Sequence, residues 1–279
     1  MPHPPLLVTG LTGQLGEALL RRGLPMPALA LSRRAQAPGL PQLRWARGAL
    51  ADFSEASPFD AALSLGPLDA FAAAVAEGRI RAGRVVAFGS TSVHAKADSP
   101  DAAERDLAAR LAAAEEALFT ACRQRGTPCL VLRPTLVWGL GRDATLSRVV
   151  QLARRWPLLP LPLGAPGLRQ PVHALDLADA ARVALALASP PSLALDLPGG
   201  ERLSFGTMLG RAVAAGAPSC RVLPLPWRGV QALAGRRAGL SGFASRLDAD
   251  LVFPSGPAAG LLGWSPRGFA PTAADFPAA

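Results

Sequence analysis

The sequence predicts a doubly wound α/β fold, in which a parallel sheet carries helices on both faces, followed by a smaller C-terminal lobe. Short apolar runs without polar alternation alternate with helix-length segments rich in Ala, Leu and Arg, a pattern typical of strands buried on both faces. A glycine-rich turn joins the first apolar run to the first such segment. The length of 279 residues, half of them apolar, suits one large domain with an appended lobe.

The elements follow from this alternation and from helix-stop residues. Gly126 and Pro128 end the longest expected helix before the next strand begins. The expected strands are 6–8, 28–31, 61–65, 85–88 and 129–132, and the expected helices are 14–22, 67–77, 104–125, 143–155 and 176–188.

The C-terminal part differs in composition from the rest. The apolar run 158–168 contains three prolines, so we expect a loop there. Beyond about residue 190 Pro and Gly become more frequent and the elements shorten, and we expect a strand at 193–197 and a helix at 204–215. The predicted organisation is a dinucleotide-binding core at 1–165 and a substrate-side lobe at 166–279, whose helix at 176–188 packs back on the core.

Composition excludes several classes of protein. The net charge of +9 comes from 28 scattered arginines and the single Lys96 rather than from a basic block, so we do not expect nucleic-acid binding. Three cysteines show neither metal-ligand spacing nor a disulfide pattern, which favours a reducing cytoplasm and predicts no metal site. We see no signal peptide and no membrane-spanning run.

The glycine loop at 9–16, Thr-Gly-Leu-Thr-Gly-Gln-Leu-Gly, carries the strongest functional signal. It follows the first expected strand and opens the first expected helix, where glycines allow a tight turn and a close approach of a pyrophosphate. The free N–H groups of the new helix attract negative charge. The residues expected to hold the cofactor here are Gly10, Thr12, Gly13, Gln14, Leu15 and Gly16.

The end of the second expected strand indicates which dinucleotide binds. NAD-preferring sites carry an acidic residue there for the ribose hydroxyls, whereas this chain has Arg33 and Arg34. An arginine at this position suits the 2′-phosphate of NADP. We therefore expect Arg33 to contact the cofactor and NADP(H) to be favoured over NAD(H), although both residues could be ordinary surface arginines.

These segments together resemble the extended short-chain dehydrogenase/reductase family, which has a Rossmann fold and includes NAD-dependent epimerases and dehydratases. The glycine spacing at 10, 13 and 16 is the family's pattern, and the resemblance extends through segments 63–67, 88–95, 132–139, 170–178 and 262–266. The resemblance implies that the cofactor also contacts Leu65, Gly66, Pro67, Ser90, Pro134 and Val137.

The catalytic pair of that family is missing. Family members use a tyrosine and, four residues later, a lysine to handle the proton, with a serine that orients the substrate. Ser90 matches the serine, but Leu107 and Leu111 occupy the expected tyrosine and lysine positions. The chain has no tyrosine, and we place Lys96 in the loop before the helix, where it cannot restore the pair.

Other polar residues could substitute for the pair. His94 follows Ser90 closely and imidazole exchanges protons near neutral pH, although its position in the family supports structure. His173 is a weaker candidate in a segment that anchors the lobe. Arg142 and Arg169 could bind an anionic substrate, but the sequence favours an interpretation as ordinary surface arginines. Glu115 is expected on the exposed face of its helix.

Three functions remain open. The chain is an atypical NAD(P)-binding member of the epimerase/dehydratase-like family, or a non-catalytic NADPH-binding structural or redox-sensing subunit, or an active reductase or nucleotide-sugar epimerase that uses Ser90 and His94. Whether it is an enzyme is therefore undecided. Partners are a small-molecule substrate or none, and the sequence leaves open a monomer, a homodimer or a larger assembly.

Overall fold

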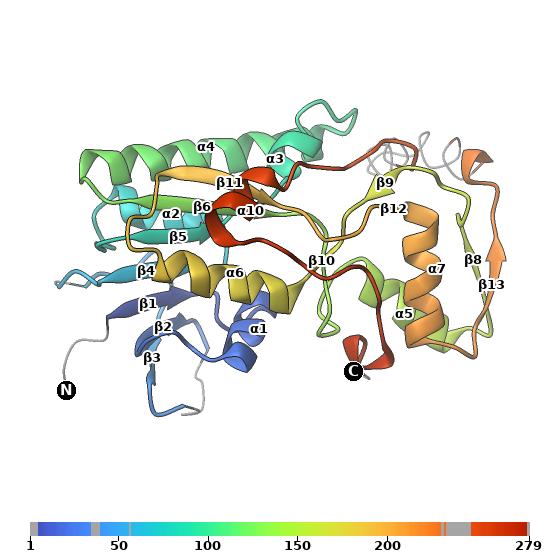
Figure 1. The fold of residues 1–279 in the computed structure, drawn as a ribbon, viewed down its shortest axis with the longest axis horizontal. Coiled ribbons are helices and arrows are strands. Elements are labelled where there is room, and N and C mark those ends of the chain that lie inside the picture. The colour runs from blue at the N-terminus through green and yellow to red at the C-terminus, as the bar shows by residue number, and fades with distance from the viewer. Residues whose placement is uncertain (1–4, 35–39, 56, 230–231, 233–246, 278–279) are drawn as a thin grey trace.

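The computed structural model describes residues 5–34, 40–55, 57–229, 232 and 247–277 and contains a seven-stranded parallel sheet in the order β11-β6-β5-β4-β1-β2-β3 (Figure 1). The doubly wound α/β fold expected from the sequence is confirmed. The strands are β1 (Leu6–Thr9), β2 (Ala28–Ser32), β3 (Leu43–Arg47), β4 (Ala61–Ser64), β5 (Val85–Phe88), β6 (Cys129–Pro134) and β11 (Leu193–Leu197).

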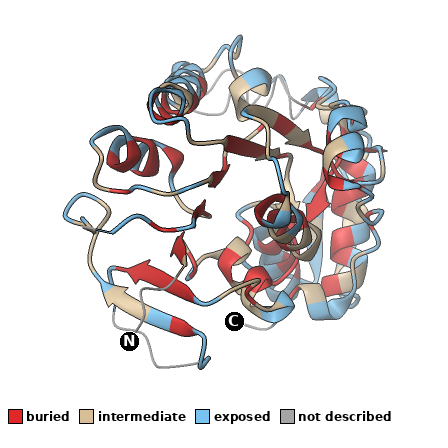
Figure 2. Ribbon diagram, turned by 60° about the vertical axis from the view of Figure 1, so that its left-hand side comes forward, coloured by how far each residue is buried: buried red, intermediate tan, exposed pale blue. Residues whose placement is uncertain are grey.

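Helices cover both faces of this sheet (Figure 2). On one face α2 (Leu68–Ala76) and α4 (Ala102–Gln124) pack together, and on the other α1 (Gln14–Arg22) packs against α6 (Ala174–Ala186). The strands between them are almost wholly buried because each strand presents apolar side chains to both layers. An ion pair between Arg22 and Asp179, 2.9 Å, joins α1 to α6 at the surface.

Two clusters of buried apolar side chains lie in the main sheet and the helices on its faces. A third cluster forms the lobe, at the far end of the molecule from β3 (Figure 1). Its centre is α5 (Leu146–Arg155) packed on α7 (Phe205–Gly216). The remaining short elements are α3 (Ser92–Ala95), β7 (Val137–Trp138), β8 (Leu158–Leu161), β9 (Leu168–Arg169), β10 (Val172–His173), β12 (Leu203–Ser204), β13 (Arg221–Pro224), α10 (Gly256–Leu262) and η1 (Ala273–Asp275).

Several elements differ from the sequence prediction, and the short elements α3, β7, β9, β10, β12, β13, α10 and η1 were not expected. β3 was not expected, because only Leu43 of its side chains is fully buried. The expected loop at 158–168 is wrong at its start, where β8 pairs in parallel with β13 despite Pro160. β11 was expected among the lobe elements, but it pairs with β6 at the edge of the main sheet. The division at residue 165 stays a prediction, since α5 before it and α7 after it share one cluster.

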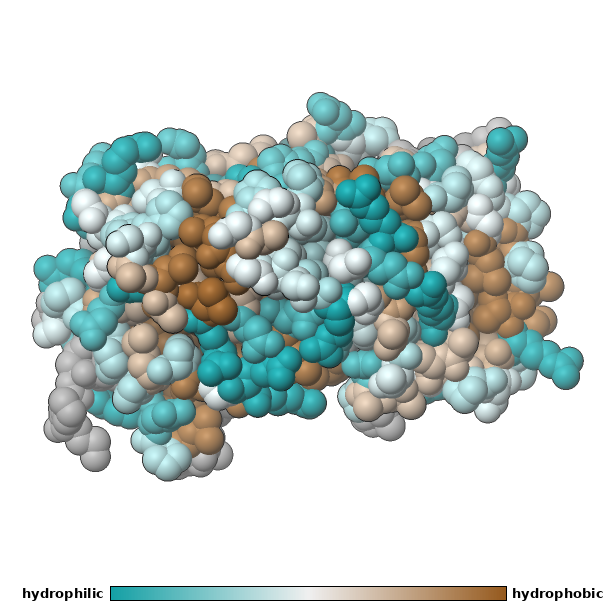
Figure 3. Space-filling model, viewed as in Figure 1, coloured by the Kyte–Doolittle hydropathy of each residue, from teal (hydrophilic) through white to brown (hydrophobic). Residues whose placement is uncertain are grey.

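An apolar region lies on the surface at the lobe end. Trp156, Leu158 and Leu223 are exposed there, and Figure 3 shows this region as brown surface over β8 and β13. None of the helices within the described ranges has the length and hydropathy needed to cross a membrane.

Candidate functional site

The glycine loop joins β1 to α1 by a turn that only glycine fits at two positions. Gly10 has a φ of +78°, and a Cβ on it would lie 2.5 Å from the backbone nitrogen of Gly66. A Cβ on Gly16 would lie 2.1 Å from the carbonyl oxygen of Leu11. The loop therefore lies in close contact with the residues that follow β4 on one side and with α1 on the other.

The N-terminus of α1 is open for an anion. Gly13 is its N-cap residue and supplies no side-chain cap, while its N–H donates to the carbonyl oxygen of Gly10 at 3.0 Å. Backbone N–H groups of a first helical turn that no side chain caps are a ready anion site. Leu11 and Thr12 of the same loop also line a cavity of about 720 Å³.

This cavity lies at the carboxyl ends of β1 and β2 and is rich in arginine. Its other lining residues are Glu17, Leu20, Ser32, Arg33, Arg34, Trp45 and Arg142. Glu17 is the one acidic residue among those described, and it pairs with Arg21 at 2.6 Å and with Arg142 at 3.3 Å. The local charge is thus positive, which suits a phosphate better than a free ribose diol.

Gln14 connects the glycine loop to the segment after β6. Its Nε2 donates to the carbonyl oxygen of Gly139 at 2.7 Å. Pro134 ends β6 and Val137 lies in β7, which pairs with β10. The glycine loop and the segment after β6, both of which are expected to contact the cofactor, are thereby joined by a hydrogen bond.

A second cavity of about 300 Å³ lies between the end of β5 and the lobe. Ser90 lines it and is half buried, with its Oγ accepting a hydrogen bond from the backbone N–H of Ser92 at 3.1 Å. The other lining residues are Thr91, Ser92, Ala95, Lys96, Thr135, Leu136, Thr145, Arg169, Gln170, Phe205, Leu247, Leu251 and Phe253. Leu107 and Leu111, half buried on α4, are not among them.

Two cationic side chains line this cavity: Arg169, which the sequence analysis weighed as a ligand of an anionic substrate but favoured as a surface residue, and Lys96, which it did not place at a site. Arg169 was expected at the surface, but it is 6% exposed and its Nη1 donates to the carbonyl oxygens of Leu168 and Ala249, each at 2.8 Å. Lys96 caps the C-terminus of α3 rather than lying in a free loop. Its rarity in this arginine-rich chain was the signal that could have drawn attention to it.

His94 lies outside this lining and belongs to a charged cluster on β6 and β11. Its Nε2 is 3.0 Å from Nη1 of Arg133 and 3.6 Å from a carboxylate oxygen of Asp196. Its ring also lies near Phe253, with centroids 6.2 Å apart. Among the described contacts, the side chains of His94 and Ser90 are not hydrogen-bonded to each other. The expected proton relay between them therefore remains a prediction.

Glu115 and Arg133 form the buried core of that cluster. Glu115 was expected on the exposed face of α4, but its side chain is 4% exposed and both carboxylate oxygens accept from Nε of Arg133 at 3.0 Å. Burial alone lowers the pKa of Arg133, yet the hydrogen bonds and charge of Glu115, together with Asp196, raise that pKa above its usual value. The pair joins α4 to β6 and lies beside Gly89, the residue before Ser90.

His173 has a structural position. Its Nδ1 accepts from the backbone N–H of Leu175 at 3.1 Å and so caps α6, and its Nε2 lies 3.1 Å from Oδ1 of Asp275. Its ring packs against that of Trp138 in a T-shaped arrangement, with the ring centroids 4.5 Å apart, and lies against Gly139. His173 thus connects α6 and the C-terminal η1 to the loop that Gln14 reaches.

Asp275 should make stability depend on acidic pH. Burial alone raises its pKa, but hydrogen bonds from His173 and from Thr272 hold it below the usual value. A lowered folded-state pKa gives stability that is complete above the unfolded value of about 3.9 and is lost as the pH falls through the folded value. Replacing Asp275 with Asn should flatten the dependence of urea-unfolding stability on pH below about pH 4, and curves parallel to the wild type would contradict this.

The fold and the position of the glycine loop are typical of dinucleotide-binding proteins. The order of strands changes direction between β1 and β4, and the loop, both cavities and Ser90 lie at the carboxyl ends of the strands near this point. Doubly wound sheets bind dinucleotides in this crevice.

Comparison with solved structures narrows the fold. MoeE5 in complex with UDP-glucuronic acid and NAD is 19% identical, with a TM-score of 0.69 over 94% of this chain and 93% of that one. WbmH from Bordetella bronchiseptica in complex with NAD+ is 17% identical, with a TM-score of 0.65 over 98% and 97%. UDP-N-acetylglucosamine 4-epimerase from Bacillus cereus is 16% identical, with a TM-score of 0.66 over 97% and 94%.

The chain therefore has the fold of NAD-dependent epimerases and dehydratases, as the sequence resemblance implied. No protein-family model and no curated protein matches the chain.

Proposed function

We propose that the chain is an atypical, cytoplasmic member of the extended short-chain dehydrogenase/reductase family that binds a nicotinamide dinucleotide, with NADP(H) favoured over NAD(H). The glycine cradle carries this proposal. Gly10 and Gly16 are each in contact with backbone that leaves no room for a side chain, and the uncapped N-terminus of α1 borders a cavity of about 720 Å³. These features suit a pyrophosphate and its adjoining nucleoside.

The residues toward each end of the dinucleotide follow from this placement. Arg33 and Arg34 would hold the 2′-phosphate at the arginine-rich cavity, and Gly13 with Gln14 and Leu15 would hold the pyrophosphate. Leu65, Gly66 and Pro67 would lie beneath the cofactor, and Pro134 with Val137 beside its nicotinamide. The bound cofactor supplies or accepts a hydride, and the protein orients it.

A small carbonyl compound as substrate is favoured by the cavity of about 300 Å³ beside Ser90. The cationic side chains of Lys96 and Arg169 at this cavity suit an anionic group, such as the diphosphate of a nucleotide sugar. Ser90 would orient the reacting oxygen through its hydroxyl group. The leucines at 107 and 111 support the other candidate, a non-catalytic NADPH-binding subunit, because they provide no proton donor.

Titration calorimetry with NADPH and NADH tests cofactor binding. Gly13→Asp should abolish binding of both nucleotides, because a carboxylate at the helix N-terminus repels the pyrophosphate. Arg33→Asp should weaken NADPH binding by about 10- to 100-fold and change NADH binding much less, since an ionic hydrogen bond is worth about 1.5–3 kcal/mol.

Arg110→Asp provides the charge-matched control, because Arg110 is exposed on α4 and its nearest acidic partner, Asp69, is 4.0 Å away. It should bind both nucleotides as the wild type does. Absence of binding by the folded wild type would overturn the proposal. Equal losses of NADPH and NADH affinity in Arg33→Asp would overturn the preference for NADP(H) alone.

A further inference from the structure

The cavity beside Ser90 contains one group suited to proton transfer. Among its described lining residues, the polar side chains are hydroxyls, the amide of Gln170, the guanidinium of Arg169 and the ammonium of Lys96. Hydroxyls and amides do not ionise near neutral pH, and a guanidinium does not give up its proton in proteins. Lys96 is therefore the lining residue that can both carry and release a proton.

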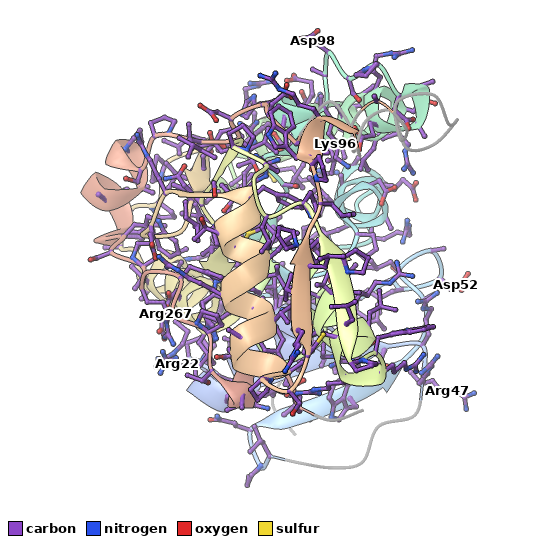
Figure 4. The ribbon with its side chains drawn as sticks, turned by 90° about the vertical axis from the view of Figure 1, so that its right-hand side faces the viewer. Arg22, Arg47, Asp52, Lys96, Asp98 and Arg267 are labelled. Atoms are coloured by element: carbon purple, nitrogen blue, oxygen red, sulfur yellow. The ribbon has the colours of Figure 1, made fainter. Side chains whose placement is uncertain are left out.

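The fold holds Lys96 in this position. Its backbone N–H donates to the carbonyl oxygen of Ser92 at 3.1 Å at the end of α3, six residues after Ser90. Its Nζ lies 3.3 Å from Oε1 of Glu104 at the start of α4, and Oε2 of Glu104 accepts from Oγ of Ser99 at 2.8 Å. Figure 4 labels Lys96 together with Asp98, which projects from the same loop at the edge of the molecule.

Solvent can reload this amine. The side chain of Lys96 lines the cavity and is 23% exposed, so water reaches it. His94, the other candidate, is engaged with Arg133 and does not line the cavity.

We propose that Lys96 is the proton donor for carbonyl reduction in this cavity, taking the part that tyrosine plays in the resembled family; this rests on the proposed NADP(H) function. A bound NADPH would supply the hydride to the carbonyl carbon, and the ammonium of Lys96 would transfer a proton to the carbonyl oxygen. The carbonyl π bond breaks and new C–H and O–H bonds form. The products are the alcohol, NADP+ and a neutral amine, which water protonates again.

The test uses the full chain, NADPH and two carbonyl probes. Glyoxylate is a small anionic aldehyde that matches the cationic lining, and 4-nitrobenzaldehyde is a neutral one. NADPH consumption and alcohol formation are measured for the wild type, Lys96→Met, Lys96→Arg and the surface control Arg110→Met. NADPH affinity is measured separately by calorimetry, so that loss of the cofactor and loss of proton transfer are distinguished.

We expect the wild type and Arg110→Met to reduce a probe at equal rates. Lys96→Met should slow reduction by about 10²- to 10⁴-fold with NADPH affinity unchanged. Lys96→Arg should be similarly slow, because it keeps the charge and the reach but cannot release a proton. A Lys96→Arg rate within about threefold of the wild type would show a role of charge alone and overturn the proposal.

Two further outcomes complete the test. Wild-type protein that binds NADPH but reduces neither probe would overturn the role of Lys96 and leave cofactor binding intact. Should the variants fail to fold, acetylation of folded wild type serves instead, since Lys96 is the only lysine and the chain has no tyrosine. Rate loss should then follow the extent of Lys96 acetylation by mass spectrometry, and full activity of the acetylated protein would contradict the proposal.

Discussion

Replacing Arg133 with Met is expected to lower the free energy of unfolding by about 3–5 kcal/mol, because the change leaves a buried carboxylate without its partner. The side chain of Glu115 is 4% exposed and both its oxygens accept from Arg133. One oxygen also lies against Gly89, where a Cβ would approach it to 2.8 Å, so Glu115 has little room to turn toward water. Urea unfolding at neutral pH measures the loss.

The double variant Glu115→Leu with Arg133→Met serves as the control for this prediction. An apolar pair of similar volume removes the unpaired charge, so most of the lost stability should return. If Arg133→Met alone costs less than about 1 kcal/mol, the pair behaves as a surface ion pair and the buried geometry is wrong.

Replacing Gly16 with Ala is expected to destabilise the protein by about 3 kcal/mol, at the upper end of the usual cost of overpacking. The new methyl group would meet the backbone of Leu11 at 2.1 Å from its carbonyl oxygen, and backbone cannot move aside as a flexible side chain can. α1 must shift, and with it the N-terminus proposed to hold the pyrophosphate. NADPH affinity should therefore fall together with the midpoint of thermal unfolding.

Gly48→Ala provides the matched substitution for comparison. A Cβ at Gly48 meets only Cδ1 of Leu31, at an ordinary 3.5 Å, so stability should change by about 0.5 kcal/mol or less. Equal effects of the two alanines would show that the helix and its preceding turn are not in the close contact described.

The sheet and the glycine loop could be predicted because their signals are local. Strands such as β5, Val85–Phe88, are continuous apolar runs, and glycines at three-residue spacing between a strand and a helix are typical of a dinucleotide-binding turn. β3 could not be predicted in this way, because Arg44 and Arg47 point to solvent on a half-exposed edge and interrupt the apolar pattern. Its pairing with β2 depends on tertiary contacts rather than on the local sequence pattern.

The residues of the second cavity could not be predicted from the local sequence, because tertiary contacts bring them together. The buried side chain of Arg169 donates to the carbonyl oxygen of Ala249, which is 80 residues away in the sequence. Glu115 appeared to be a helix-surface residue until Arg133 on β6 was placed beside it. The lone Lys96 was visible in the composition, but only the fold brings it to the cavity that Ser90 lines.

The position of β11 also bears on how the chain is made. Residue 134 ends β6, and the strand that covers its outer edge starts at residue 193. A ribosome adding ~5–20 residues per second needs roughly 3–12 seconds to deliver that strand. During this interval β6 is an uncovered edge of apolar residues, open to pairing with another nascent chain. Slower translation after β6 should therefore lower the soluble yield, and chaperones that cover exposed strands should restore it.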